Sequence, residues 1–112
     1  MSDHPDDRCA RIADVIACWH PLAQLAEFAV RRHGYGNSDV GHGVTYPGDA
    51  DDHERRAEGR QPIPPGFVEV YGYWGQAFEF TIEEHAYLAI LAQILRAKSM
   101  TSEAAKVEQL LA

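Results

Sequence analysis

Residues 67–95 read FVEVYGYWGQAFEFTIEEHAYLAILAQIL and carry the strongest structural pattern of this 112-residue chain. The segment 67–74 is rich in β-branched and aromatic residues in alternation, which is typical of a β-strand. Residues 75–77 contain a glycine that can turn the chain, and residues 78–80 begin a second strand that pairs back on the first. We therefore expect a short antiparallel hairpin over residues 66–81.

The sequence after this hairpin predicts two helices. Residues 81–84 read TIEE and have the form of a capping box, in which the Thr81 hydroxyl accepts from an amide of the first turn and Glu84 reaches back. Apolar residues then cover most of a helix over residues 82–98. Residues 99–101 break the pattern, and a last helix over residues 102–112 is expected to fold back on it. The chain therefore ends in a helical hairpin.

The N-terminal segment predicts helices over about residues 5–33. Pro5, followed by two aspartates, is typical of a first helical turn. An apolar stripe at i, i+3, i+4 and i+7 follows, formed by Ile12, Val15, Ile16 and Trp19. Pro21 would clash with a carbonyl of an unbroken helix, so we expect a break near it and a second helix that ends at Gly34.

The central segment, residues 34–65, shows no periodicity and is expected to be a loop. It is glycine-rich at first and then acidic. A connection of this length is uncommon in a compact domain, where it serves as a binding loop or a mobile excursion. The expected fold class is α+β in a single domain over residues 1–112, with N-terminal helices, a long central loop, a β-hairpin and a C-terminal helical hairpin. Two strands alone are marginal, so the hairpin needs a helix against one face or a further strand from the central segment.

The charge of the chain restricts its partners. Seventeen acidic against ten basic residues give a net charge of −7, which repels nucleic acids and anionic membrane surfaces. The N-terminus lacks the apolar core of a signal peptide, so a cytoplasmic location is expected. Cys9 and Cys18 lie nine positions apart and fall on opposite sides of a helix, so they cannot pair with each other there. Their spacing suggests neither a zinc motif nor a redox motif.

Histidines and carboxylates give no catalytic or metal-binding pattern. His33, His42 and His53 lie in or beside the glycine-rich loop, but no pair has the i, i+4 spacing of a metal motif. We expect exposed loop histidines, no metal site and no cofactor. Glu69 and Glu79 are expected on the solvated face of the hairpin, and no cysteine and histidine are placed as nucleophile and base. The domain is therefore expected to be non-catalytic, and a small-ligand or metal-binding function of the histidine- and glycine-rich loop is the alternative.

Aromatic and acidic residues together indicate a protein-binding surface. Tyrosine and tryptophan anchor interfaces, and surrounding carboxylates steer a basic partner. The hairpin aromatics are expected to pack on the following helix, which leaves the loop residues and one tryptophan for a partner. The predicted partner-binding residues are Tyr35, Tyr46, Asp49, Asp51, Asp52, Glu54, Glu58 and Trp74.

About half of the chain resembles a known family. Residues 63–75, IPPGFVEVYGYWG, followed by FEFTI at 78–82 and the leucine-rich helix pair, are similar to small bacterial immunity proteins. That family neutralises toxins delivered by contact-dependent or secretion-based competition systems. The resemblance implies a stoichiometric binder of a cognate, basic toxin domain, without chemistry of its own. A plain scaffold or adaptor is a further possibility.

Overall fold

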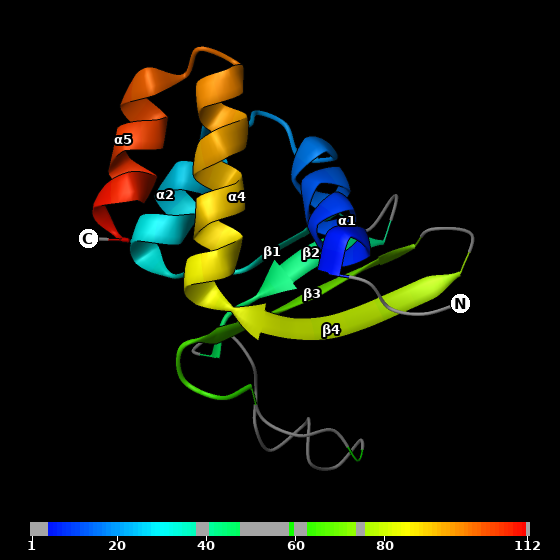
Figure 1. The fold of residues 1–112 in the computed structure, drawn as a ribbon. Helices are drawn as coiled ribbons and strands as arrows, with labels where there is room; N and C mark the ends of the chain where they lie inside the picture. Colours follow the sequence, from blue (N-terminus) through cyan, green and yellow to red (C-terminus); the bar gives the residue numbers. More distant parts are fainter. Residues whose placement is uncertain (1–4, 38–40, 48–58, 60–62, 74–75, 112) are drawn as a thin grey trace.

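The computed structural model describes residues 5–37, 41–47, 59, 63–73 and 76–111. Four helices and four strands follow one another along these residues. In Figure 1 the strands form one layer, and the helices lie together on one side of it. The predicted α+β class is confirmed. The elements are α1 (Pro5–Ala17), α2 (Gln24–Arg31), β1 (Tyr35–Asn37), β2 (His42–Thr45), β3 (Phe67–Tyr73), β4 (Ala77–Glu83), α4 (Glu84–Ala97) and α5 (Thr101–Gln109).

The four strands form one antiparallel sheet in the order β1-β2-β3-β4. Val70 lies opposite Val44 on β2 and opposite Phe80 on β4. Because side chains alternate along a strand, these three residues share one face of the sheet. That face lies against the helices, since Val44 and Val70 are fully buried. Tyr71 and the residues paired with it point to the other face.

The expectation of a loop over residues 34–65 is wrong at two places, because β1 and β2 lie within it. The glycines of these strands explain why no strand was predicted. A β-carbon at either Gly36 or Gly43 would overlap the hydroxyl oxygen of Tyr71. Because glycine has no β-carbon, the Tyr71 ring can lie across both strands. Glycine has low β-propensity by itself. Packing by a residue distant in sequence therefore decides the local structure.

The hairpin is confirmed, but its second strand is longer than predicted and the capping box is wrong. Strand β4 continues to Glu83, and Thr81 pairs with Glu69 in the sheet. Helix α4 begins at Glu84, and its cap residue Glu83 makes no side-chain hydrogen bond to the helix. The Glu84 amide instead donates to the Gly66 carbonyl at 2.8 Å. Residues 81–83, which the sequence pattern assigned to a helix cap and first turn, therefore pair with β3 in the sheet.

The break in the N-terminal helices is confirmed, since α1 ends at Ala17 and α2 begins at Gln24, on either side of Pro21. Helix α2 ends earlier than the predicted Gly34. Arg32 takes the left-handed conformation, with φ of 54°, and its amide donates to the Ala29 carbonyl. Among the described residues no helix is long and apolar enough to cross a membrane.

The core lies between the sheet and the helices. Helix α4 runs through its centre, as its apolar circumference predicts, and contacts α1, α5, β3 and β4. Leu91 and Leu95 of α4 are fully buried, as are Ile12 and Ile16 of α1. At about 25 cal/mol per Å² of apolar surface, each such side chain contributes about 1.5–3 kcal/mol. This core holds one face of the sheet and leaves the other free of described helices.

Candidate functional site

Two predicted interface residues are buried instead of exposed. Tyr35 is 8% exposed and Tyr46 only 1%, so the expectation that these tyrosines offer a binding surface is wrong. Tyr35 belongs to the helix-facing side of β1, where its hydroxyl lies 2.9 Å from the hydroxyl of Tyr87. The ring of Tyr46 packs edge-on against Tyr87, with 6.5 Å between centroids. Both are core residues because they follow the alternation of a strand that was not predicted.

The other predicted interface residues lie outside the described part of the chain. They remain predictions, as does the placement of His53. They are Asp49, Asp51, Asp52, Glu54, Glu58 and Trp74.

The described residues offer a different surface on the side of the sheet that faces away from the helices. Strand β4 alternates between exposed residues and half-buried ones, and its half-buried phenylalanines and isoleucine face the helices. Tyr73, the partner of Ala77 across the hairpin, is 59% exposed. We name the exposed residues of this side the β3–β4 face. It consists of Tyr73, Ala77, Glu79, Thr81 and Glu83.

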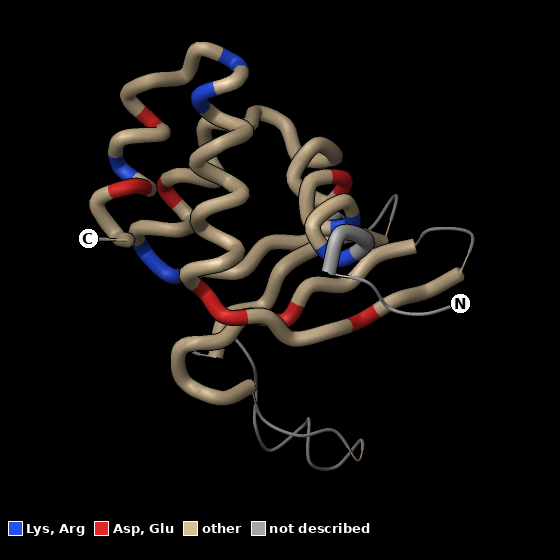
Figure 2. The backbone as a smooth tube through the Cα atoms, in the orientation of Figure 1, with Lys and Arg blue, Asp and Glu red and all other residues tan. Residues whose placement is uncertain are grey.

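The β3–β4 face is acidic. Neither β3 nor β4 contains a lysine or an arginine, and Glu79 and Glu83 of β4 are both exposed on this face. Figure 2 shows acidic positions along these strands, whereas the helical layer carries both acidic and basic positions. Arg96 of α4 and Lys106 of α5, for example, pair with Glu108 and Glu27 within that layer. The two sides of the molecule therefore differ in charge.

The two strand glutamates that might have done acid–base chemistry do not face each other. Glu69 lies opposite Thr81, and Glu79 lies opposite Tyr71. Glu79 is exposed as expected, but Glu69 is only 5% exposed, so its predicted solvation is wrong. The register therefore does not pair these two carboxylates directly across the hairpin.

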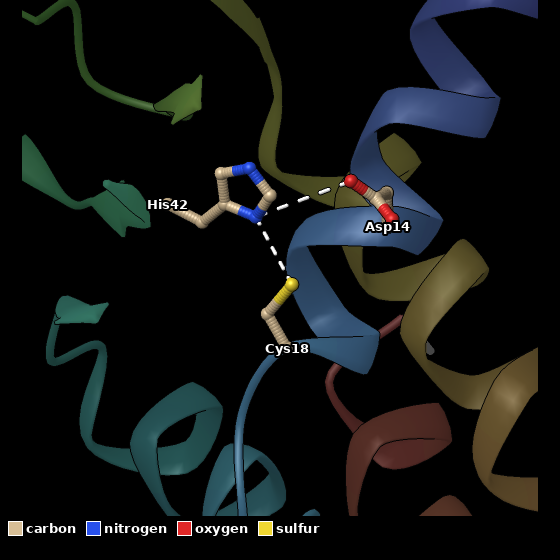
Figure 3. A group of neighbouring side chains, drawn as sticks. All are labelled: Asp14, Cys18 and His42. Carbon is tan, nitrogen blue, oxygen red and sulfur yellow. Dashed lines mark hydrogen bonds and ion pairs between the residues drawn. The ribbon is translucent and has the colours of Figure 1, made fainter. Parts of the chain in front are cut away.

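A second cluster joins α1 to the sheet. His42 of β2 is 7% exposed, and its Nδ1 lies 3.1 Å from Sγ of Cys18 and 4.0 Å from Oδ2 of Asp14. Figure 3 shows the side chains of Asp14, on α1, and Cys18, directly after it, both pointing to this one ring nitrogen. The other nitrogen, Nε2, lies 3.2 Å from the carbonyl oxygen of Tyr73. Since a carbonyl can only accept, Nε2 carries a proton, and in the neutral imidazole Nδ1 is then the acceptor that faces the cluster.

The electrostatics of the cluster disfavour a thiolate. Burial raises the pKa of the Cys18 thiol, and the negative charge of Asp14 raises it further. The neutral thiol therefore donates to Nδ1 of His42. Catalytic cysteines have the opposite property, a pKa lowered by a nearby cation or helix N-terminus. The pair resembles a nucleophile and base in distance, which the sequence did not suggest, but the thiol is not activated.

The cluster was not predicted because His42 lies 24 or more positions from the other two residues, so the three form no local motif. Asp14 lies on α1, and Cys18 directly follows the helix with its amide still bonded to the Asp14 carbonyl. Their i, i+4 spacing, which puts both side chains on one side, is a signal that the sequence contains. Their partner, His42, was expected to be an exposed loop residue, and this is wrong because β2 turns it inward. His33 is exposed as expected. Cys9 and Cys18 form no disulfide with each other, as their spacing predicted.

No family model, curated protein or solved structure matches this chain. Functional inference therefore rests on the geometry of the described residues.

Proposed function

We propose that this protein is a non-catalytic binding protein of the immunity type, which blocks a basic bacterial toxin domain through its β3–β4 face. The observation that carries the proposal is the sheet face with an exposed tyrosine among carboxylates and no described helix over it. All four described helices lie on the opposite side. The helical layer thus acts as a support that fixes the strands.

The chemistry of the face fits a protein partner. Tyr73 offers a large amphipathic ring, and tyrosine is among the residues that contribute most binding energy at interfaces. Glu79 lies two positions from Ala77, the cross-strand partner of Tyr73, and Glu83 lies at the other end of β4. A net charge of −7 adds a long-range field. Such a field speeds the encounter with a basic partner and disfavours acidic ones. A nuclease or other domain with a cationic active site has the complementary charge.

The position of β4 supports the same proposal. Within the described sheet β4 is the last strand in the order, and it runs for seven residues. An edge strand offers backbone amides and carbonyls to an extended segment of a partner. A toxin domain can therefore contact the exposed side chains and the backbone of one element together.

Co-purification tests the proposal. In the family that residues 63–82 resemble, the gene beside that of an immunity protein encodes its toxin. We expect the product of the adjacent gene to co-purify with this protein and to be inhibited at one-to-one stoichiometry. Failure of both co-purification and protection of toxin-expressing cells would remove the proposal.

Matched substitutions test the face itself. Tyr73→Ala removes the exposed ring, and Val30→Ala is its control because Val30 is the exposed large apolar residue of the helical layer, at 47%. Thr81→Lys and its control Gln93→Lys each add one positive charge at an exposed site, on β4 and on α4 respectively. We expect Tyr73→Ala to weaken binding by about 2 kcal/mol or more, about 30-fold, and Thr81→Lys to slow association. Equal effects of each variant and its control would contradict the assignment.

A further inference from the structure

The Asp14, Cys18 and His42 side chains supply one oxygen, one sulfur and one nitrogen at a single point. Their ligand atoms all lie within 4.8 Å of one another. Zinc accepts these three ligand types, whereas calcium and magnesium prefer oxygen alone. The donor set thus selects a borderline transition-metal ion.

The distances are close to those that a tetrahedral zinc ion requires. Zinc bonds of about 2.0–2.3 Å put the nitrogen about 3.6 Å from the sulfur and about 3.4 Å from the oxygen. Nδ1 of His42 lies 3.1 Å from Sγ of Cys18 and 4.0 Å from Oδ2 of Asp14. Shifts of about 0.5 Å for Sγ of Cys18 and about 0.6 Å for Oδ2 of Asp14 would bring these two distances to the zinc values. Asp14 is 38% exposed, so an ion can enter from solvent.

The backbone around His42 prepares its ring for coordination. Nε2–H donates to the Tyr73 carbonyl, and a ligating histidine usually holds its other nitrogen in this way. Gly72 makes room for the ring, because a β-carbon there would lie 2.7 Å from Cδ2 of His42. On the other side, the i, i+4 spacing of Asp14 and Cys18 directs both side chains to one point. Three elements of the fold therefore converge on the cluster.

We propose that Asp14, Cys18 and His42 form a zinc site that joins helix α1 to the sheet. Two anionic ligands and one neutral ligand neutralise the charge of a divalent ion. Binding replaces the Cys18 thiol proton, which passes to solvent, and water occupies the fourth position. The ion links residues 24 or more positions apart and stabilises the packing of α1 on β2. The side chains of the site lie on the helical side of the sheet, opposite the side chains of the β3–β4 face, although the Tyr73 backbone carbonyl contacts His42.

Metal titration of the metal-free chain tests this site with two probes. Zinc alone is added and the melting temperature is recorded, and cobalt is added as a spectroscopic substitute for zinc. We expect zinc to raise the melting temperature in proportion to the logarithm of its excess over Kd. Cobalt should give a thiolate-to-cobalt charge-transfer band in the near ultraviolet, which a site without sulfur does not produce.

Variants separate the cluster from other metal contacts. Cys18→Ser and His42→Gln should remove the zinc shift, and Cys18→Ser should also remove the cobalt band. Cys9→Ser on the same helix and His33→Gln, both at exposed positions, are the matched controls and should keep both signals. Asp14→Asn should bind more weakly and keep the band. If these variants fold poorly, the cobalt band of the unaltered chain still decides.

Two results would overturn the proposal. The first is a wild-type chain that gives no cobalt-thiolate band and no zinc shift, which would leave the cluster as a hydrogen bond between thiol and imidazole. The second is a zinc shift of equal size in Cys18→Ser and in wild type, which would place the ion elsewhere.

Discussion

The buried pair of Tyr35 and Tyr87 gives the sharpest test of the core. Their hydroxyl oxygens lie 2.9 Å apart, and the two residues are 8% and 1% exposed. Tyr35→Phe removes one hydroxyl and leaves that of Tyr87 without this partner, which costs about 1–3 kcal/mol. Tyr87→Phe should cost a similar amount. The double variant should be at least as stable as the less stable of the two single variants, because the hydrogen bond is already lost after the first change.

Urea unfolding of the four proteins measures this double-mutant cycle. With a slope of about 1.5 kcal/mol per M, a loss of about 1.5 kcal/mol lowers the midpoint by about 1 M. Tyr73→Phe is the control, because its hydroxyl belongs to an exposed side chain. This change should alter the free energy of unfolding by less than about 0.5 kcal/mol. Costs of Tyr35→Phe and Tyr87→Phe that add within about 0.3–0.5 kcal/mol would refute the buried bond. If Tyr35→Phe abolished partner binding without changing the free energy of unfolding, Tyr35 would belong to the interface and not to the core.

Two further predictions concern the same sheet and core. Gly43→Ala should lower the free energy of unfolding by about 1–3 kcal/mol, because the new methyl group would overlap both the Tyr71 hydroxyl and the rigid Tyr35 backbone carbonyl; an unchanged urea midpoint would contradict the packing of Tyr71 over β2. Burial raises the pKa values of Tyr35 and Tyr87, so the unfolded chain, with tyrosine pKa values of about 10, releases these protons first as the pH rises. These two groups should therefore leave the free energy of unfolding unchanged below about pH 10 and lower it above that pH. The decrease should be less steep in the Tyr35→Phe/Tyr87→Phe variant. Urea midpoints measured across that pH range test this.

The elements with local patterns were predictable from the sequence. The alternation along β3 and the apolar circumference of α4 each indicate the secondary structure from the residues of one segment alone. Pro21 predicted the helix break for a local steric reason. The end of β4 was not predictable in the same way, because Thr81 and Glu83 suit a helix cap as well as a strand. Pairing with β3 decided between them.

Strands β1 and β2 were not predicted because the residue that explains their glycines, Tyr71, lies on another strand far along the chain. Gly36 and Gly43 have no side chain that signals a strand, and their role becomes visible only with Tyr71 above them. The error then moved Tyr35 and Tyr46 from the core to the expected interface. A strand alternates its sides, whereas a loop gives no such rule.

The candidate sites were missed for a related reason. His42 joins Asp14 and Cys18 only after β2 pairs with β3, so the cluster depends on a register that no single segment encodes. The β3–β4 face needed the knowledge that all described helices cover the same side of the sheet. Tyr73 was expected to pack on the following helix, and it is exposed because it lies on the opposite face.

The proposed binding face is tested most directly by amide hydrogen exchange of this protein, alone and with the product of the adjacent gene. We predict that the complex slows exchange in β3 and β4, over residues 67–73 and 77–83, and leaves α2 and α5 unchanged. Protection confined to α2 and α5, or no protection at saturating partner, would contradict binding through the β3–β4 face.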